Sequence, residues 1–524
     1  MIRFVYFCCV LLLASSFNIY AGGAKPQDKD LKPVYQTIVK DAANSATKGG
    51  CGEFFAWRAS YYLHEIMPSY YTSKDTIWLD SAVKAFDFLL DLRISGPDGY
   101  KGWVGGEKEL WEDANVGDAI LYAHMLEFAE VVLKDTALKA VYGASAEKYI
   151  SIFKKDYFEK WDARGTWHED GPYAVYNQWD YYCTKGDVST WKKYPNAHVS
   201  LPFNKQNDAA VCFLKLYRIS GDTVYRERAQ KLFSFMKSRM QLVDDYYVWN
   251  YWEAFGPWDV DMDKKITRHW MSVHPYRNYQ AGEISQIVEA YNTGVVFDQQ
   301  DIEKIINTNL KAMWNGDKED PKFINSNAKL PANPLTPEEK KAAEEEAKAN
   351  VYSKGGTQFA GCLWEALCPF DQTIRDLYAL QLKKGKGGFA KEYFEKVTLK
   401  TPPSFARKYA DLPVTVFERP WSSVLSLTVA AVMPRTVSKA APSVVLCKSR
   451  RDVDLEVSVY SADGKEKKGV LFNGKFAGGT DGLVGVQTLS WDGTLPNVKL
   501  DKGSYRVRWT VSDGYREFPV EIVE

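Results

Sequence analysis

The stretch RHWMSVHPYRNYQAGE gathers side chains that exchange protons and neutralise anions. It holds two of the chain's six histidines, His269 and His274, followed by Arg277, Tyr279 and Glu283. Proton abstraction next to a carboxylate-bearing carbon needs a base, an acid and a cation, and these residue types supply all three. In this hypothesis His274 or Tyr279 is the base. His269 or Arg277 offsets the substrate carboxylate, and Glu283 orients a neighbour.

Two other aromatic segments carry candidate chemistry. HEDGPYAVYNQWDYY offers His168 and Tyr176 as substrate contacts. WNYWEAFGPW places Glu253 among tryptophans, where burial would raise the pKa of its carboxyl and suit it to act as the acid of a glycoside hydrolase. The alternative for Glu253 is a carboxylate that anchors its loop through backbone N–H groups.

The aromatic content is high, with 17 Trp, 32 Tyr and 26 Phe. Trp and Tyr rings stack on the apolar faces of sugars and leave their polar tips free for hydrogen bonds, although they also fill helical cores. The residues we predict as stacking platforms are Trp103, Trp249, Trp252 and Trp258. The partner we expect is therefore a glycan.

Among the remaining acidic residues, we predict two helix caps and no metal ligand. Asp113 and Asp208 stand at the starts of predicted helices, so helix capping explains both. The run DVDMD from Asp259 begins like a calcium loop, but Lys264 replaces its glycine and Trp270 its closing glutamate. His269 and His274 match no zinc spacing either, and we predict no metal and no cofactor.

The first 21 residues have the layout of a secretory signal peptide, with Arg3 before an apolar run and small Ala21 after it. The run is shorter than the roughly 20 residues that span a bilayer. We expect a secreted or periplasmic protein that is not inserted in a membrane after signal cleavage.

The charge balance and the cysteine spacing argue against a nucleic-acid partner and against a metal site built from cysteines. Lys plus Arg equals Asp plus Glu at 67 each, so no global field attracts nucleic acid, and we expect no nucleic-acid partner. Six cysteines follow the predicted signal peptide without C-x-x-C spacing, which favours buried free thiols over metal ligands.

Residues 22–415 show helical periodicity arranged as repeated helix pairs. The segments that align as second helices are TIWLDSAVKAFDFLL, TALKAVYGASAEKYISIF, TVYRERAQKLFSFM and FDQQDIEKIINTNLKAMW. Short loops within pairs and long aromatic loops between them favour an α/α toroid of helical hairpins, with a simple solenoid as the alternative. Residues 317–353 are polar and charged, which predicts a solvent-facing insertion.

Residues 440–524 change to a period of two. In SYRVRWTV, Tyr505, Val507 and Trp509 fall on one face while Arg506 and Arg508 fall on the other. We predict a small C-terminal β-sandwich, so the chain is mainly α with a β module at its end.

A resemblance supports these expectations. Residues 203–317 combine LKLYRISGDTVY, YYVWNYW and EAYNTGVVFDQQDI, and are similar to the α/α-toroid carbohydrate-active families, among them D-glucuronyl C5-epimerases and toroid polysaccharide lyases. SWDGTLPNVKLDKGSYRVRWTV resembles the immunoglobulin-like modules that end many bacterial secreted proteins. The epimerase tyrosines find no residue-by-residue match, so no catalytic residue is carried over.

The sequence therefore predicts an exported carbohydrate-active protein with uronate-directed lyase or epimerase chemistry. Two alternatives stay open: a glycoside hydrolase with a carboxylate pair, and a non-catalytic glycan-binding or cell-surface protein.

Overall fold

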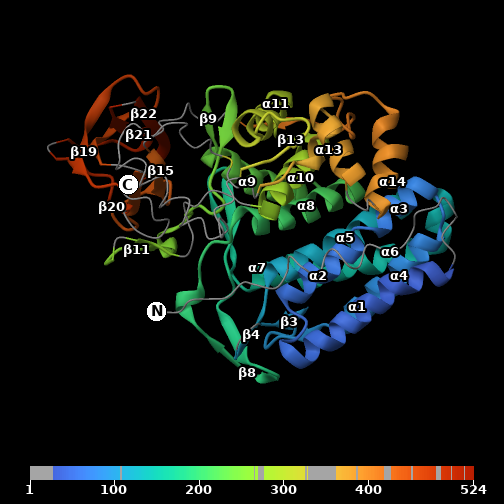
Figure 1. The fold of residues 1–524 in the computed structure, drawn as a ribbon. Helices are drawn as coiled ribbons and strands as arrows, with labels where there is room; N and C mark the ends of the chain where they lie inside the picture. Colours follow the sequence, from blue (N-terminus) through green and yellow to red (C-terminus); the bar gives the residue numbers. More distant parts are fainter. Residues whose placement is uncertain are drawn as a thin grey trace.

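The computed structural model describes residues 28–106, 109–264, 266–268, 277–324, 327, 361–384, 388–417, 427–449, 452–478, 486–496, 498–512 and 514–523. Helices make up about 47% of the structure and strands about 26%. The helices lie in the N-terminal part and the longer strands after it, and Figure 1 shows the two parts side by side, the C-terminal strands in red. The predicted signal peptide, residues 1–21, and most of the predicted insertion at 317–353 lie outside the described residues.

The helical part is a succession of hairpins. Its helices are α1 (Asp28–Lys48), α2 (Glu53–Leu63), α3 (Ile66–Ser73), α4 (Ile77–Asp91), α5 (Asn115–Lys134), α6 (Thr136–Phe153), α7 (Lys160–Ala163), α8 (Phe203–Ser220), α9 (Thr223–Arg239), α10 (Arg277–Thr293), α11 (Gln299–Asn307), α13 (Gln372–Lys384) and α14 (Gly388–Lys396). π-Helical turns extend α6 and α11. Neighbouring first helices pack in order, α2 on α5, α5 on α8 and α8 on α10, and α14 packs on α3.

Local sequence signals explain why the hairpins start and stop where they do. The Asp135 carboxylate accepts hydrogen bonds from the backbone N–H groups of Ala137 and Leu138 and so caps α6. Asp222 caps α9 in the same way. Between α8 and α9, Gly221 adopts a φ of +73°, the left-handed conformation that ends a helix at little cost when the residue is glycine.

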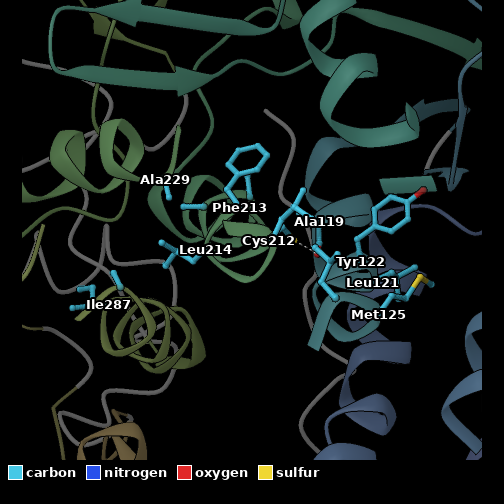
Figure 2. Close-up of a cluster of buried hydrophobic side chains, with 14 of the residues drawn as sticks. Ala119, Leu121, Tyr122, Met125, Cys212, Phe213, Leu214, Ala229 and Ile287 are labelled. Atoms are coloured by element: carbon cyan, nitrogen blue, oxygen red, sulfur yellow. Dashed lines mark hydrogen bonds between the residues drawn. The ribbon is translucent and has the colours of Figure 1, made fainter. Parts of the chain in front are cut away.

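The hydrophobic core of this part lies between the stacked helices. Figure 2 shows Ala119, Leu121, Tyr122 and Met125 of α5 beside the Cys212 region of α8. The Cys212 thiol donates a hydrogen bond to the backbone oxygen of Ala119 at 3.2 Å, so the two helices approach closely. All six described cysteines are free, and every one except the half-buried Cys362 is buried, which confirms the prediction of buried free thiols.

Short strands, unexpected from the sequence, occur outside the helices of this part. They are β1 (Ile94–Ser95), β2 (Lys101–Gly102), β3 (Val104–Gly105), β4 (Leu110–Asp113), β5 (Trp167–Asp170), β6 (Tyr173–Tyr176), β7 (Tyr181–Thr184), β8 (Asp187–Lys193), β9 (Gln241–Val243), β10 (Tyr246–Val248), β11 (Val260–Asp261), β12 (Ile266–Thr267), β13 (Val295–Val296) and β14 (Thr415–Val416). Strands β3, β4, β7 and β8 form one sheet, and β5 and β6 form a hairpin. Pairing satisfies the backbone of these connections and fixes the side chains that they carry.

The C-terminal part contains two sheets, of order β16-β22-β21-β18-β19 and β15-β17-β20. Its strands are β15 (Leu427–Met433), β16 (Thr436–Val437), β17 (Ser443–Ser449), β18 (Val453–Ser461), β19 (Lys467–Phe476), β20 (Val486–Trp491), β21 (Gly503–Val511) and β22 (Gly514–Ile522). The first strand begins earlier than the predicted boundary at 440. Val507 and Trp509 are fully buried, as the alternation in SYRVRWTV predicted, while Arg506 and Arg508 of the other face are half-buried.

The two parts share a core. Val199, Ala254 and Val260, which lie in connections of the helical part, belong to the same buried cluster as the C-terminal strands. The Arg239 guanidinium at the end of α9 lies over the Phe518 ring of β22, 4.9 Å from its centroid. The C-terminal strands therefore support the connection that contains Glu253. Within the described part of the chain, no helix is long and apolar enough to cross a bilayer.

Candidate functional site

The predicted catalytic segment is described in part. His269 and His274 lie outside the described residues, and the structure describes Arg277 only as the first residue of α10, without its side chain. Their roles stay predictions. Tyr279 is half-buried, and its ring lies 5.0 Å from that of Tyr251.

Glu283 is fully buried one turn further along α10. Its Oε2 accepts a hydrogen bond from the Trp249 indole at 2.7 Å, while its Oε1 has no partner. Burial raises the pKa of Glu283 well above its usual range. A carboxyl without exposure cannot contact a substrate in this conformation, and its hydrogen bond from Trp249 fixes the connection after β10 against α10.

Three residues that we predicted as substrate contacts are buried instead. Trp103, Tyr176 and Trp249 are at most 1% exposed, so no ring face is open to a sugar. The Trp103 indole donates to the backbone oxygen of Leu89 at 2.8 Å and packs against Tyr122. The rings fill gaps between helices and the short sheets, a use of aromatic residues that composition alone does not separate from glycan binding.

Trp252, Trp258 and His168 meet in one cluster. The Trp252 and Trp258 indoles donate to the backbone oxygen and Oγ of Ser200, at 2.7 and 3.0 Å. The His168 ring lies 4.6 Å from Trp258, so the connections at 165–182 and 249–263 come together. Burial and the neighbouring His198 lower the pKa of His168 to about 4, which keeps its ring neutral near pH 7.

Glu253 faces the C-terminal strands. It is 3% exposed and accepts a hydrogen bond from the Asn250 amide. Burial raises the pKa of Glu253, and Arg239, Arg516 and Lys448 oppose that rise. A carboxyl enclosed by cations at a buried junction is unsuited to the acid role that we predicted for it, because no substrate can reach it.

A different group of charges lies at the N-terminal ends of the first helices. Glu53 begins α2, Lys205 lies in the first turn of α8, and their side chains are 2.8 Å apart. Glu112 on β4 and Asp208 on α8 complete the group, which we call the carboxyl cluster. The charges of Glu53 and Lys205 shift the pKa values of both Glu112 and Asp208, so each of these two carboxyls lies within electrostatic reach of the Glu53–Lys205 ion pair.

The surroundings of Glu112 suit its carboxyl to exchange a proton near neutral pH. Its carboxylate accepts hydrogen bonds from the Gln178 amide and the Tyr182 hydroxyl, and it is half-buried. Burial and the negative charge of Glu53 raise the pKa of Glu112 to about 7, against the opposing charge of Lys205. Near neutral pH both of its protonation states are populated.

Asp208 has the same property for the same reason. Its Oδ1 accepts a hydrogen bond from the Gln286 amide of α10 at 2.6 Å, and its Oδ2 has no partner. Burial first, and then Glu53, raise the pKa of Asp208 to about 7. The predicted capping role is wrong, because α8 begins at Phe203, before Asp208, with Pro202 at its cap position.

Asp113 is not a cap either. Its carboxylate lies 3.1 Å from the Lys160 ammonium and 2.8 Å from the Arg164 guanidinium, in a fully buried ion cluster. Ala114 occupies the cap position of α5 without a side-chain hydrogen bond. Both aspartates were assigned to capping from position alone, and partners distant in the sequence determine their roles.

Several buried polar atoms without partners belong to α8, the helix of Asp208, and to Gln286, which bonds Asp208. They are both amide atoms of Asn204, the Oδ1 of Asn207 and the Oε1 of Gln286. A buried polar atom that lacks a hydrogen bond costs free energy, so a concentration of such atoms indicates a place that water or a polar ligand completes.

No family model matches this chain, and neither does any curated protein compared with it. The chemistry is therefore argued from the carboxyl cluster itself.

One signal for the carboxyl cluster is present in the sequence. Its acids stand near the starts of successive first helices, with Glu53 at the first residue of α2, Glu112 three residues before α5 and Asp208 in the second turn of α8. Stacked hairpins bring these helix starts to the same end of the helical part.

Replacing Glu112 with Gln is expected to change how stability depends on pH. The folded-state pKa of Glu112 is raised from 4.5 to about 7, so its contribution is fully present below pH 4.5 and is lost as the pH rises through 7. After a discount for partial exposure, we expect the parent protein to lose ~2 kcal/mol relative to Glu112→Gln over this interval. Urea unfolding of both proteins between pH 4 and 8 measures the difference, and parallel profiles would contradict it.

Proposed function

We propose that this protein is a glycoside hydrolase that cleaves a glycan by general acid–base catalysis with Glu112 and Asp208. The observation that carries the proposal is the placement of Glu112 and Asp208 about the same Glu53–Lys205 ion pair, at one end of the stacked helices, where the pKa of each is raised to about 7. Glycosidic bonds are cleaved by two carboxyls, of which one must be protonated and the other ionised at the working pH. A pKa near the operating pH is the optimum for both tasks.

The proton balance of the step is simple. The protonated carboxyl gives its proton to the glycosidic oxygen as the bond to the anomeric carbon breaks. The ionised carboxyl takes a proton from the water that attacks this carbon, so the products are two shorter glycans and the pair ends with its protons exchanged. The negative charge of Glu53 raises the pKa values of Glu112 and Asp208, and the positive charge of Lys205 lowers them.

The arrangement of the hairpins supports a glycan as the substrate. α2, α5, α8 and α10 pack in sequence and α14 packs on α3, the order expected of an α/α toroid, and we extend the proposal to that fold. The sequence resembles toroid families that act on carbohydrates. Export, as the predicted signal peptide implies, would place the protein where polysaccharides are found.

A product assay on a polysaccharide panel tests the proposal. Purified protein is incubated with xylan, mixed-linkage β-glucan, galactomannan, polygalacturonate and alginate. New reducing ends without absorbance in the near ultraviolet are the expected result. Reducing ends accompanied by that absorbance would overturn hydrolysis in favour of uronate lyase chemistry with His269 and His274. Binding without any product would favour a glycan-binding protein.

A further inference from the structure

Exposed aromatic rings are rare in the described part of this chain, and two of them share one helix face. Phe54 is 40% exposed and Tyr61 is 49% exposed, both on α2. Half-buried Trp57 lies between them, at a spacing of three and then four residues. Residues at this spacing lie on the same face of a helix. We call these three rings the aromatic ridge.

The remaining faces of α2 are already occupied. Phe55, Ala59 and Leu63 are buried in the core, and the Arg58 guanidinium is paired with Asp41 of α1 at 2.8 Å. The ridge is therefore not a side effect of a loosely packed helix. Phe54 and Tyr61 face outward from a helix that is otherwise well packed, and Trp57 between them is partly covered by α5.

The ridge is continuous with the carboxyl cluster. The Trp57 indole donates to Oε1 of Glu53 at 3.3 Å, and Glu53 is paired with Lys205. The Trp57 ring also packs on the short apolar cluster that contains Val116 and Ile120 at the start of α5. From Phe54 to Tyr61 the ridge runs along α2 for seven residues, ~10 Å at the rise of an α-helix.

We propose that the aromatic ridge is the binding surface for the part of a glycan chain that extends beyond the bond to be cleaved. The rings offer apolar faces that stack on sugars, and the carboxylate and ammonium of Glu53 and Lys205 offer hydrogen bonds to hydroxyls at one end. This inference rests on the proposed function and adds a preference to it: chains long enough to cover the ridge are bound more tightly than short oligosaccharides.

The test compares ridge variants on long and short substrates. Phe54→Ala/Tyr61→Ala, which leaves the contacts of Glu53 intact, is expected to raise KM for the longest chain that the protein cleaves by about tenfold, with little change for the shortest. Trp57→Phe keeps a ring but removes the bond to Glu53, so it separates stacking from hydrogen bonding. Tyr515→Ala is the matched control, because Tyr515 is 51% exposed on β22, outside the ridge.

Affinity gel electrophoresis with the five polysaccharides distinguishes this inference from the proposed function. If nothing is cleaved but the ridge variants alone lose binding, the ridge stands and the hydrolase proposal fails. If cleavage proceeds and the ridge variants match the parent at every chain length, the ridge inference is wrong. It is equally overturned if Tyr515→Ala weakens binding as much, or if the ridge variants change only the oligomeric state in solution.

Discussion

Replacing Asp208 with Asn is expected to lower kcat on the cleaved glycan by on the order of 10³-fold, within the range that general acid–base groups contribute. Asn keeps the size of the side chain and can still accept the 2.6 Å hydrogen bond from Gln286, but it cannot exchange a proton. Glu112→Gln should cause a loss of similar size, because the reaction needs both carboxyls.

The pH profile shows whether these losses are catalytic. Activity of the parent protein should fall on both sides of pH 7, because one carboxyl must be protonated while the other is ionised. Each single variant should lose one limb of that profile. Glu227→Gln, an exposed glutamate of α9, is the matched control and should retain parent activity. Near-parent kcat in Asp208→Asn with an unchanged profile would sink the assignment.

Replacing Lys160 with Met is expected to destabilise the protein by ~3–5 kcal/mol, the range for removing one partner of a buried ion pair. Lys160, Asp113 and Asp118 have fully buried side chains, and the Lys160 ammonium contacts both carboxyls. Burial disfavours the charge of Asp113, but Lys160 and Arg164 hold its pKa below the usual range. Without Lys160, the buried carboxyl groups of Asp113 and Asp118 would lose the cation that contacts both of them.

Urea or thermal unfolding followed by circular dichroism measures this effect. The double variant Lys160→Met/Asp118→Asn should recover part of the loss, because it removes one of the buried carboxyls along with the ammonium. Arg58→Met removes an exposed pair with Asp41 and should cost less than about 1 kcal/mol. Equal effects of Lys160→Met and Arg58→Met would show that burial of the cluster does not matter.

Some helix ends and strand faces could be predicted because their causes are local, although the predicted caps Asp113 and Asp208 were wrong. The segment TALKAVYGASAEKYISIF is α6, whose first residue follows the capping aspartate Asp135. The alternation in SYRVRWTV assigned Val507 and Trp509 to the buried face of β21. In each case the residues that decide the structure lie within a few positions of it.

Which aromatic rings face solvent could not be predicted. Trp103 and Trp249 stood in glycine- and aromatic-rich connections and are buried, whereas Phe54 and Tyr61 stood in an ordinary helix and are exposed. Burial depends on which other segments pack above a residue. Composition and periodicity hold no information about those segments when they are distant in the sequence.

The sequence by itself determined the hairpins, the C-terminal strands and the residue types available for proton exchange, because propensity, capping and periodicity act over short distances. Only the tertiary structure decided which acids work together. Glu253 and Glu283 became buried structural groups, while Glu112 and Asp208, which lie far apart in the chain, came under the charges of the same Glu53 and Lys205. A carboxyl's pKa depends on its burial and on charges a few ångströms away, and both are set when the helices stack.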